Sequence, residues 1–428
     1  MAPSAADLPS AADGAMSLRC TVQRYTWSKS MQHTEQTNHA RPAPEPPLRT
    51  LPDQTAEWRP CGANPLSWDE ARQAIAEADA KDGARTDIGV GDLSSWVLGP
   101  GPGGVASLVA VPVPGRPRSA PVPMRRAAFG QLAEAIGAPS AYLLKLPART
   151  AVACIAHGMQ QIPQRQAARL LRMARGEVRA VASDSYAPLD NELVMDTLES
   201  TLRAQGILRD VRVTDLSLGP TTGMRLTLPS RDKAVRVGDV VALGLDVLNG
   251  EILNRSLSIT PATYRLVCLN GMRSADVQGI RRFRHVGDPR RLAEAFADAV
   301  PVALAEAEGL RTRMARAVDV LVDDILADID GLDAFGLTQT DADAAARDLF
   351  SERGVALPED RSEWGALPEV HEARVSVWDV ANAITHSAQR HTREVIDVTT
   401  GERSQLPGTD RRLALESAAG AYLMRRTR

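Results

Sequence analysis

Arginine and aromatic side chains between residues 260 and 292 are the residues of this chain best suited to a chemical role. The stretch holds seven arginines against two aspartates, a local formal charge of +5 in a chain of formal net charge −3. Arginines bind phosphates and planar rings stack on bases, so the pattern is typical of a groove that follows a nucleic-acid strand. The candidate contact residues are Tyr264, Arg265, Arg281, Arg282, Phe283, Arg284, His285, Arg290 and Arg291.

A second group of arginines lies on a pair of strands predicted over residues 168–174 and 177–183. We assign Arg172, Arg175 and Arg179 of this group to the same nucleic-acid interface. The competing interpretation of both groups is a solvated sheet edge, where charged side chains also prevent sheets from pairing edge to edge. The sequence leaves these two interpretations open.

Catalytic residues are harder to find. Cys154 and His157 lie one turn apart on a predicted helix and could act as nucleophile and base, although a buried, unreactive cysteine is the favoured interpretation. The aspartates between Asp319 and Asp333 have helical spacing and are more typical of a solvated helix face than of a metal site. No Gly-x-Ser-x-Gly, Walker or Rossmann motif occurs. We therefore expect no catalytic residues, no metal and no cofactor.

Composition narrows the class of protein. A chain of 428 residues can bury a large core. Its four cysteines have no paired spacing, which argues against a disulfide scaffold or a zinc ribbon. The N-terminus lacks the pattern of a signal peptide, and no run of about 18 apolar residues could span a membrane. We expect a cytoplasmic protein that makes no membrane contact.

The pattern of apolar residues predicts four regions that would position these side chains. Residues 1–63 are rich in Pro, Ala, Ser, Gln and Thr and are predicted to be a disordered tail. Residues 64–120 form a small α/β lead-in, in which Ser67 and Glu70 make a capping box at a helix start. Residues 121–335 form an α+β core, and residues 336–428 a helical region.

Within the core, three short helices over residues 125–162 precede a series of strands. Further strands are predicted over residues 209–218, 222–229, 236–248 and 251–260, with Asn249 and Gly250 as a two-residue hairpin turn. Apolar residues then keep helical spacing from Leu292 to Ile329, where Pro301 should kink or divide the helix. The predicted fold is α+β, with a curved antiparallel sheet and a long kinked helix packed on it.

The order of several short motifs resembles the phage/plasmid-like "domain of unknown function 932" family over roughly residues 120–425. The motifs are FGQL at 129–132, AYLLKLP at 141–147, SDSYAPLDN at 183–191, RVGD at 236–239, RLVCLN at 265–270, RHVG at 284–287 and SVWDVANAIT at 376–385. The resemblance implies a home in phages, plasmids or integrated elements, near replication and recombination genes. It implies no established activity. The predicted architecture is also similar in outline to single-strand annealing recombinases.

We therefore expect a non-catalytic protein of a mobile element that binds single-stranded DNA or RNA in annealing, recombination or replication, with homo-oligomers as candidate assemblies. One alternative is a factor that binds host proteins or counters host defence, with the acidic helix 319–333 and the N-terminal tail as the partner surfaces. Another is an unrecognised hydrolase that uses Cys154 or the aspartate series.

Overall fold

One large antiparallel sheet is the main β element of the structure. The computed structural model describes residues 45–54, 57–60, 64–90, 96–109, 120–162, 169–237, 239–265, 270–273, 280–389, 392–396, 403–407 and 409–427. Among these, nine strands form one sheet in the order β1-β9-β10-β12-β13-β14, with β2 on β9, β11 on β12 and β15 on β13. Their bounds are β1 Glu57–Pro60, β2 Leu66–Ser67, β9 Arg212–Leu218, β10 Thr221–Thr227, β11 Lys233–Arg236, β12 Asp239–Gly250, β13 Leu257–Arg265, β14 Asn270–Arg273 and β15 Arg281–Phe283.

Both faces of this sheet are covered, and the two-residue period of the strands separates them. Met224 and Leu226 of β10 join one hydrophobic core. Arg225, between them, binds Glu416 of the last helix through two hydrogen bonds of 3.0 and 2.6 Å. Arg225 therefore points to the opposite face, where it meets a helix that is remote in sequence.

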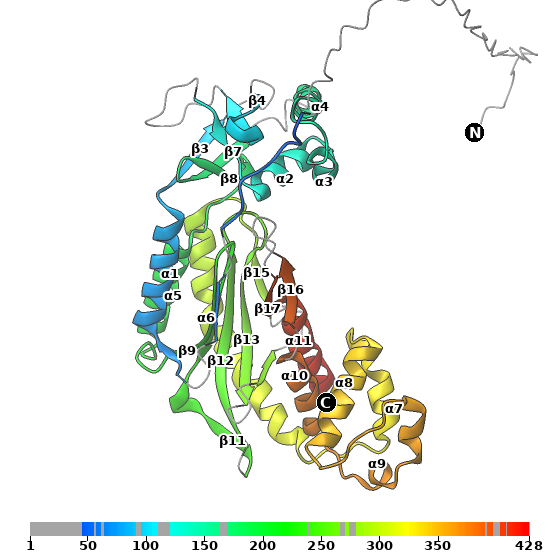
Figure 1. The fold of residues 1–428 in the computed structure, drawn as a ribbon. Helices are drawn as coiled ribbons and strands as arrows, with labels where there is room; N and C mark the ends of the chain where they lie inside the picture. The colour runs from blue at the N-terminus through cyan, green and yellow to red at the C-terminus, as the bar shows by residue number, and fades with distance from the viewer. Residues whose placement is uncertain are drawn as a thin grey trace, which may run out of the picture. The chain divides into compact units, whose positions relative to one another are not determined.

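Three helices cover the first face: α1 Trp68–Asp82, α5 Asn191–Ala204 and α6 Pro289–Ala317 (Figure 1). Buried residues of all three pack with the sheet in one core, for example Trp68, Leu198 and Phe296. The predicted capping box begins α1, since Ser67 accepts from the Glu70 N–H at 3.3 Å and the Ser67 N–H donates to Glu70 at 2.8 Å. That prediction is confirmed.

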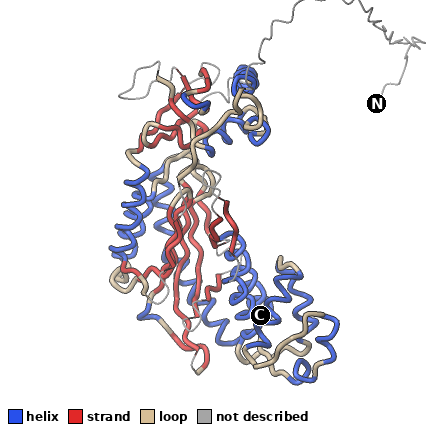
Figure 2. The backbone as a smooth tube through the Cα atoms, viewed as in Figure 1, coloured by secondary structure: helices blue, strands red, loops and turns tan. Residues whose placement is uncertain are grey.

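Two three-stranded sheets and three short helices lie in the chain between β2 and β9 of the large sheet. Figure 2 distinguishes helices from strands by colour. The helices fall where the sequence predicted them. The bounds of the strands and helices of this region are β3 Arg85–Val90, β4 Val97–Pro100, β5 Ala106–Val109, β6 Val122–Pro123, α2 Arg126–Ala135, α3 Ser140–Leu143, α4 Ala148–Gln160, β7 Arg169–Ala174 and β8 Glu177–Ser183.

Part of the predicted N-terminal tail is an extended strap across these elements. The N–H groups of Leu48, Arg49 and Leu51 donate to the carbonyls of Leu146, Gly104 and Met124 at 2.9–3.2 Å. Leu48 is 2% exposed, and β1 pairs with β9. The prediction of disorder is therefore wrong for residues 45–54 and 57–60, because the strap satisfies its backbone groups on its neighbours. Residues 1–44 lie outside the described residues.

The C-terminal helices form a further core with the end of α6. The bounds of the remaining elements are α7 Ile325–Asp330, α8 Gln339–Ser351, α9 Pro368–Glu372, α10 Val377–Gln389, β16 Thr392–Ile396, β17 Arg403–Pro407 and α11 Thr409–Arg426. The hairpin of β16 and β17 was not predicted from the sequence. The proposed division into four regions stays a prediction.

The predicted hairpin turn at Asn249 and Gly250 is wrong. Both residues lie in β12 and pair with Thr222 and Thr221 of β10. The Asn249 side chain is buried and donates to the Leu189 carbonyl at 2.8 Å. The chain instead reverses over residues 251–256, because Asn249 is needed inside the fold and not at a solvated turn.

A long helix packed on the sheet is confirmed as α6, but its predicted end is corrected. The helix α6 runs without interruption through Pro301 and ends at Ala317, and a separate helix α7 begins at Ile325. Asp324 caps α7 by accepting from the Ala327 N–H at 3.0 Å. The acidic segment 319–333 is therefore a connection followed by two short helical segments, and not one helix face. The α+β class and the antiparallel sheet are confirmed, while the curvature of the sheet stays a prediction.

Candidate functional site: an exposed basic segment beside a buried ionic network

Four arginines at the junction of β15 and α6 are exposed and have no ion pair with any described residue. They are Arg282, Arg284, Arg290 and Arg291; we call this set the basic segment. Arg281 differs, because two of its nitrogens each lie 2.8 Å from the carboxylate of Glu306 on α6. Its charge is therefore balanced inside the chain.

Local structure fixes the place of the basic segment. Strand β15 pairs with β13, which puts Arg282 opposite Ser258. Asp288 then caps α6 by accepting from the Arg290 N–H at 2.8 Å, and Pro289 takes the first helical position. Arg290 and Arg291 thus lie in the first turn of a long helix, where unpaired N–H groups already make the potential positive. The helix terminus and the four guanidinium groups add their fields.

The two aromatic candidates both pack against other side chains of the protein. Phe283 is half-buried and meets Phe296 of α6 edge to face, with ring centroids 5.8 Å apart. Tyr264 is 3% exposed, donates to Asp246 at 2.5 Å and lies under the guanidinium of Arg225 at 4.9 Å from the ring centroid. The prediction that Tyr264 stacks on a base is corrected, because its ring is buried, whereas the ring of Phe283 is partly exposed and already packs on Phe296.

His285 is also removed from the interface, because it is buried. Its Nε2 accepts from the Leu257 N–H at 3.2 Å, so the proton of the neutral ring is on Nδ1 and is donated to Tyr186 Oη at 2.9 Å. Burial, together with the charge of Arg172, lowers the pKa of His285 to about 4. The imidazole is therefore neutral at pH 7, and its two hydrogen bonds hold the chain next to Arg284 against the protein interior.

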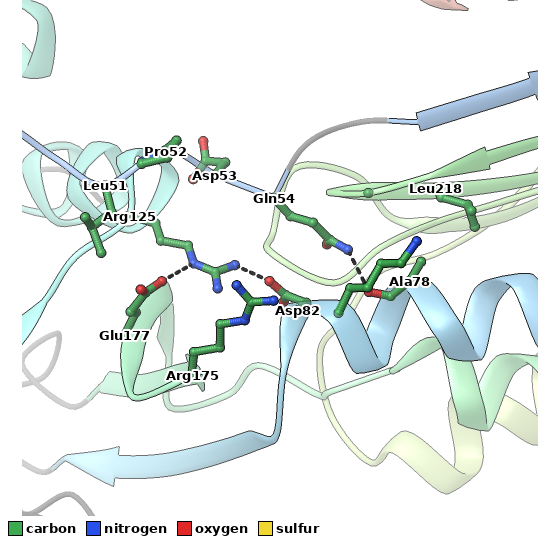
Figure 3. A pocket seen from close by; sticks show the side chains of 12 residues that line it. Leu51, Pro52, Asp53, Gln54, Ala78, Asp82, Arg125, Arg175, Glu177 and Leu218 are labelled. Carbon is green, nitrogen blue, oxygen red and sulfur yellow. Dashed lines mark hydrogen bonds and ion pairs between the residues drawn. The ribbon is translucent and has the colours of Figure 1, made fainter. Parts of the chain in front are cut away.

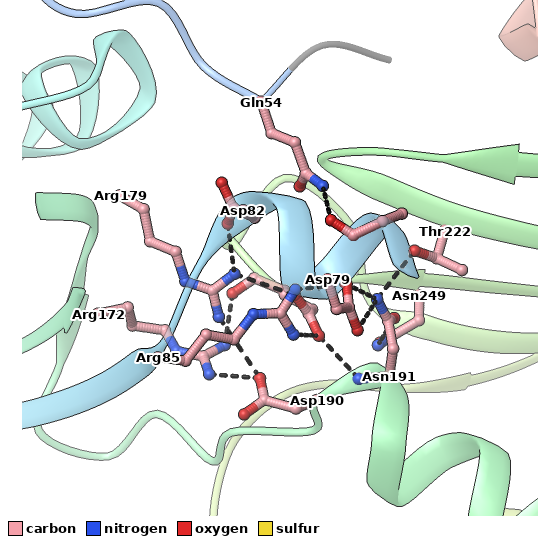
Figure 4. Close-up of polar contacts among 12 residues, drawn as sticks. Gln54, Asp79, Asp82, Arg85, Arg172, Arg179, Asp190, Asn191, Thr222 and Asn249 are labelled. Carbon is pink, nitrogen blue, oxygen red and sulfur yellow. Dashed lines mark hydrogen bonds and ion pairs between the residues drawn. The ribbon is translucent and has the colours of Figure 1, made fainter. Parts of the chain in front are cut away.

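Arg172 and Arg179 belong to a buried ionic network, shown in Figure 4, and not to a surface. Arg172 has no exposed surface; it pairs with Asp190 and with Asp87 at 3.1 Å, and donates to the Glu251 carbonyl at 2.6 Å. Arg179 is 2% exposed and lies 3.0 Å from the Glu251 carboxylate. Their assignment to a nucleic-acid interface is therefore wrong.

Glu251 is the centre of this network. Its carboxylate accepts from Arg85 at 2.6 Å and from the Asn191 N–H at 2.7 Å, in addition to Arg179. Asp79 lies beside it and pairs with Arg85 at 2.5 Å, and burial raises the pKa of Asp79 to about 6. Arg85 and Glu251 carried no signal in the sequence, because 166 residues separate them.

Arg175 is the exposed member of this second group. It lies at the turn between β7 and β8 and lines a cavity of about 650 Å³. Figure 3 shows the cavity, with Arg125 bridging Asp82 and Glu177. The side chain of Arg265 lies outside the described residues, so its predicted role stays a prediction.

No contact among the described residues supports the two alternative sites, the Cys154–His157 pair and the acidic segment. Cys154 and His157 are both exposed on α4, which corrects the expectation of a buried cysteine, and no described hydrogen bond joins them. In the acidic segment, Asp328 pairs with Arg426 at 3.2 Å, and Asp330 pairs with Arg361. Among the described residues, no group of three or more His, Cys, Asp or Glu could hold a metal ion. None of the described helices is both long and apolar enough to cross a membrane.

Comparison with known proteins gives one match. The family described as "Domain of unknown function (DUF932)" matches residues 178–419, a range that includes the large sheet from β9 onward, the basic segment and most of α11. Neither a curated protein nor a solved structure matches the chain.

Proposed function

The chain belongs to the DUF932 family, whose function is unknown, and we propose that it binds the phosphate backbone of single-stranded nucleic acid through its basic segment, without catalysis. The observation that carries this proposal is the exposure of four arginines that have no carboxylate partner among the described residues. Uncompensated cations on one short stretch are the electrostatic footprint of phosphate binding.

The ion pairs of the buried arginines support the proposal by contrast. Arg172, Arg179 and Arg225 are buried, and each forms an ion pair with a carboxylate of the chain. Arginines with a structural role in this protein are therefore paired internally. Arg290 and Arg291 have no such ion pair with a described residue, although the helix dipole disfavours cations in a first turn by about 0.3–1 kcal/mol each. Their charge therefore suits an external anion better than the stability of α6.

Binding to the phosphate backbone without base stacking predicts a particular dependence on base sequence. Since the rings of Phe283 and Tyr264 are packed against the protein, affinity should come from phosphate contacts and depend little on base sequence. The resemblance to a family of phages and plasmids leads us to place this binding in annealing or replication of a mobile element.

Fluorescence anisotropy with a labelled 20-nucleotide strand tests the proposal. We expect the wild-type protein to bind single-stranded DNA of two unrelated sequences with similar affinity at low salt. The variant with Arg282, Arg284, Arg290 and Arg291 all changed to Ala should lose this binding, with RNA and duplex probes measured in parallel.

Arg209→Ala is the matched control, because Arg209 is an exposed arginine outside the basic segment with no ion pair to a described residue. It should bind like the wild type. Absence of wild-type binding at low salt, or full binding by the quadruple variant, contradicts the proposal.

A further inference from the structure

The cavity beside the buried network is built from segments that are far apart in sequence. The strap, α1, the start of α2, and the turns that follow β7 and β9 all contribute to it. Its volume of about 650 Å³ is within the usual range for small-molecule sites, about 300–1,000 Å³. Leu51, Pro52, Ala78 and Leu218 supply apolar wall, so the lining combines a surface for an organic group with charged groups.

Arg175 occupies a backbone position that does not suit it. Its φ is 52°, and Gly176 follows at 72°, so both residues of the β7–β8 turn are left-handed. Asn, Asp and Gly are the preferred residues for such a turn. A left-handed residue with a long side chain costs about 1–2 kcal/mol. The choice of arginine at this turn therefore has to be explained by what its side chain does.

The side chain of Arg175 is held over the end of α1. Gly83, the C-cap of α1, has φ 88°, and a Cβ at this glycine would lie 2.5 Å from Arg175 Cγ. The stem of Arg175 thus packs on a glycine, and the guanidinium lies in the cavity near Arg125 and Asp82 (Figure 3). Among the described residues, no carboxylate pairs with Arg175 or with Lys81, a second exposed cation of the lining.

Each carboxylate of the cavity has a hydrogen-bond partner at one of its oxygens, while Asp82 Oδ2 has none among the described residues. Arg125 lies 2.7 Å from Asp82 and 2.9 Å from Glu177, and Arg179 lies 3.9 Å from the other oxygen of Asp82. Asp53 accepts from the Ala127 N–H at 2.9 Å, and burial raises the pKa of its carboxyl group. Within the part of the chain that the structure describes, Arg175 and Lys81 are therefore the charged groups of the lining whose side chains have neither a hydrogen bond nor an ion pair.

We propose that this cavity binds a phosphate monoester of nucleotide size, with Arg175 and Lys81 holding the phosphate and the apolar wall contacting the organic group. The guanidinium supplies paired N–H donors and the ammonium a compact charge, a combination suited to a phosphate dianion. Apart from Leu218 and Gly219, the lining residues precede the range matched by the family. The site is thus distinct from the basic segment and does not depend on the function proposed for it.

Isothermal titration calorimetry of the full chain tests the site with three probes: dAMP, deoxyadenosine and inorganic phosphate. We expect dAMP to bind, deoxyadenosine to bind at least about tenfold more weakly, and inorganic phosphate to compete. Arg175→Asn is the variant of choice, because Asn tolerates a positive φ and preserves the turn. It should weaken dAMP binding about tenfold or more, and Lys81→Gln should also weaken it.

Arg209→Ala is the matched control, since it removes an exposed arginine that lies outside both the cavity lining and the basic segment and should leave dAMP binding unchanged. Failure of dAMP to bind at millimolar concentration, equal affinity for deoxyadenosine, or unchanged binding in Arg175→Asn would overturn the proposal.

The phosphate could belong to a free nucleotide or to the end of a strand, and a second comparison separates these sources. If a 5′-phosphorylated oligonucleotide binds more tightly than its hydroxyl form, and Arg175→Asn abolishes the difference, the cavity takes strand ends. If dAMP binds and the two oligonucleotides do not differ, the cavity takes free nucleotides. Binding of the hydroxyl form reports on the basic segment alone, so the two proposals fail separately.

Discussion

At the scale of single residues, burial divides the arginines of this protein into two kinds. Arg172 is fully buried and held by two carboxylates, whereas Arg284 is exposed with no ion pair among the described residues. The sequence showed both as members of arginine clusters. It could not separate them, because the partners of Arg172 include Asp87, 85 residues away. Arginine-rich spacing therefore located the basic segment and also a cluster that belongs to the interior.

Replacing Arg172 tests its structural role. Arg172→Met should lower the free energy of unfolding by about 3–5 kcal/mol, because it removes the ion pair of Asp87 and, among the described residues, leaves Asp190 with only the longer contact to Arg179 at 3.6 Å. Urea denaturation measures the change. Arg203→Met, at an exposed arginine of an i,i+4 pair with Glu199, is the control and should have little effect. If Arg172→Met lowers the free energy of unfolding no more than Arg203→Met does, the structural role of Arg172 is contradicted.

His285 should make the stability of the protein fall in acid. In the unfolded chain its imidazole takes up a proton near its usual pKa of 6.5, whereas in the folded chain the pKa is about 4. The unfolded state therefore binds more protons between these values, and the free energy of unfolding falls as the pH is lowered from 6.5 to 4.

The comparison that isolates this effect is urea denaturation of wild type and His285→Asn at pH 7, 5.5 and 4.5. The wild-type protein should lose more stability across this range than the variant. Equal pH dependence in the two proteins would show that His285 is not the neutral buried group described.

At the scale of elements, periodicity predicted well what local packing decides and poorly what distant contacts decide. The strand pair β7 and β8 and the helix α5 follow from apolar spacing that is readable in the sequence. The turn between β12 and β13 was misplaced, because Asn249 hydrogen-bonds to Leu189, 60 residues away. A dipeptide that favours a turn in isolation is overruled by a buried partner.

Close packing of the central strands gives a test at this scale. A Cβ at Gly244 of β12 would lie 2.1 Å from the Leu226 carbonyl oxygen and 2.6 Å from the Tyr264 ring. Gly244→Ala should therefore destabilise the protein by about 1–3 kcal/mol or more, through strain in the sheet. Thermal denaturation measures this. The control is Gly89→Ala in β3, where no atom lies within 4 Å of the new Cβ and little change is expected.

At the scale of the whole molecule, charged contacts join the sheet to the C-terminal helix. Arg225 in β10 binds Glu416 in α11, and Arg412 of the same helix lies 2.8 Å from Asp215 of β9. The sequence predicted an α+β core and a C-terminal helical region, but not that α11 covers the second face of the sheet. Such a contact joins residues 191 positions apart, which no local pattern can show.

Removal of this contact should affect the whole fold. Glu416→Ala leaves Arg225 buried with Asp246 as its remaining ion-pair partner among the described residues. We expect a loss of about 3–5 kcal/mol in the free energy of unfolding. Glu372→Ala, at an exposed residue of α9, should have little effect. Equal stability of the two variants in urea denaturation would contradict this role of α11.

The salt dependence of single-strand binding tests the central claim most directly. Contacts from four arginines to phosphates predict a slope of log K against log salt of about −3, and each arginine removed from the basic segment should reduce its magnitude by about 0.7. A slope of that size for the wild type, falling toward zero in the quadruple Ala variant, is the predicted result. Binding whose salt dependence is the same in both proteins would contradict the claim.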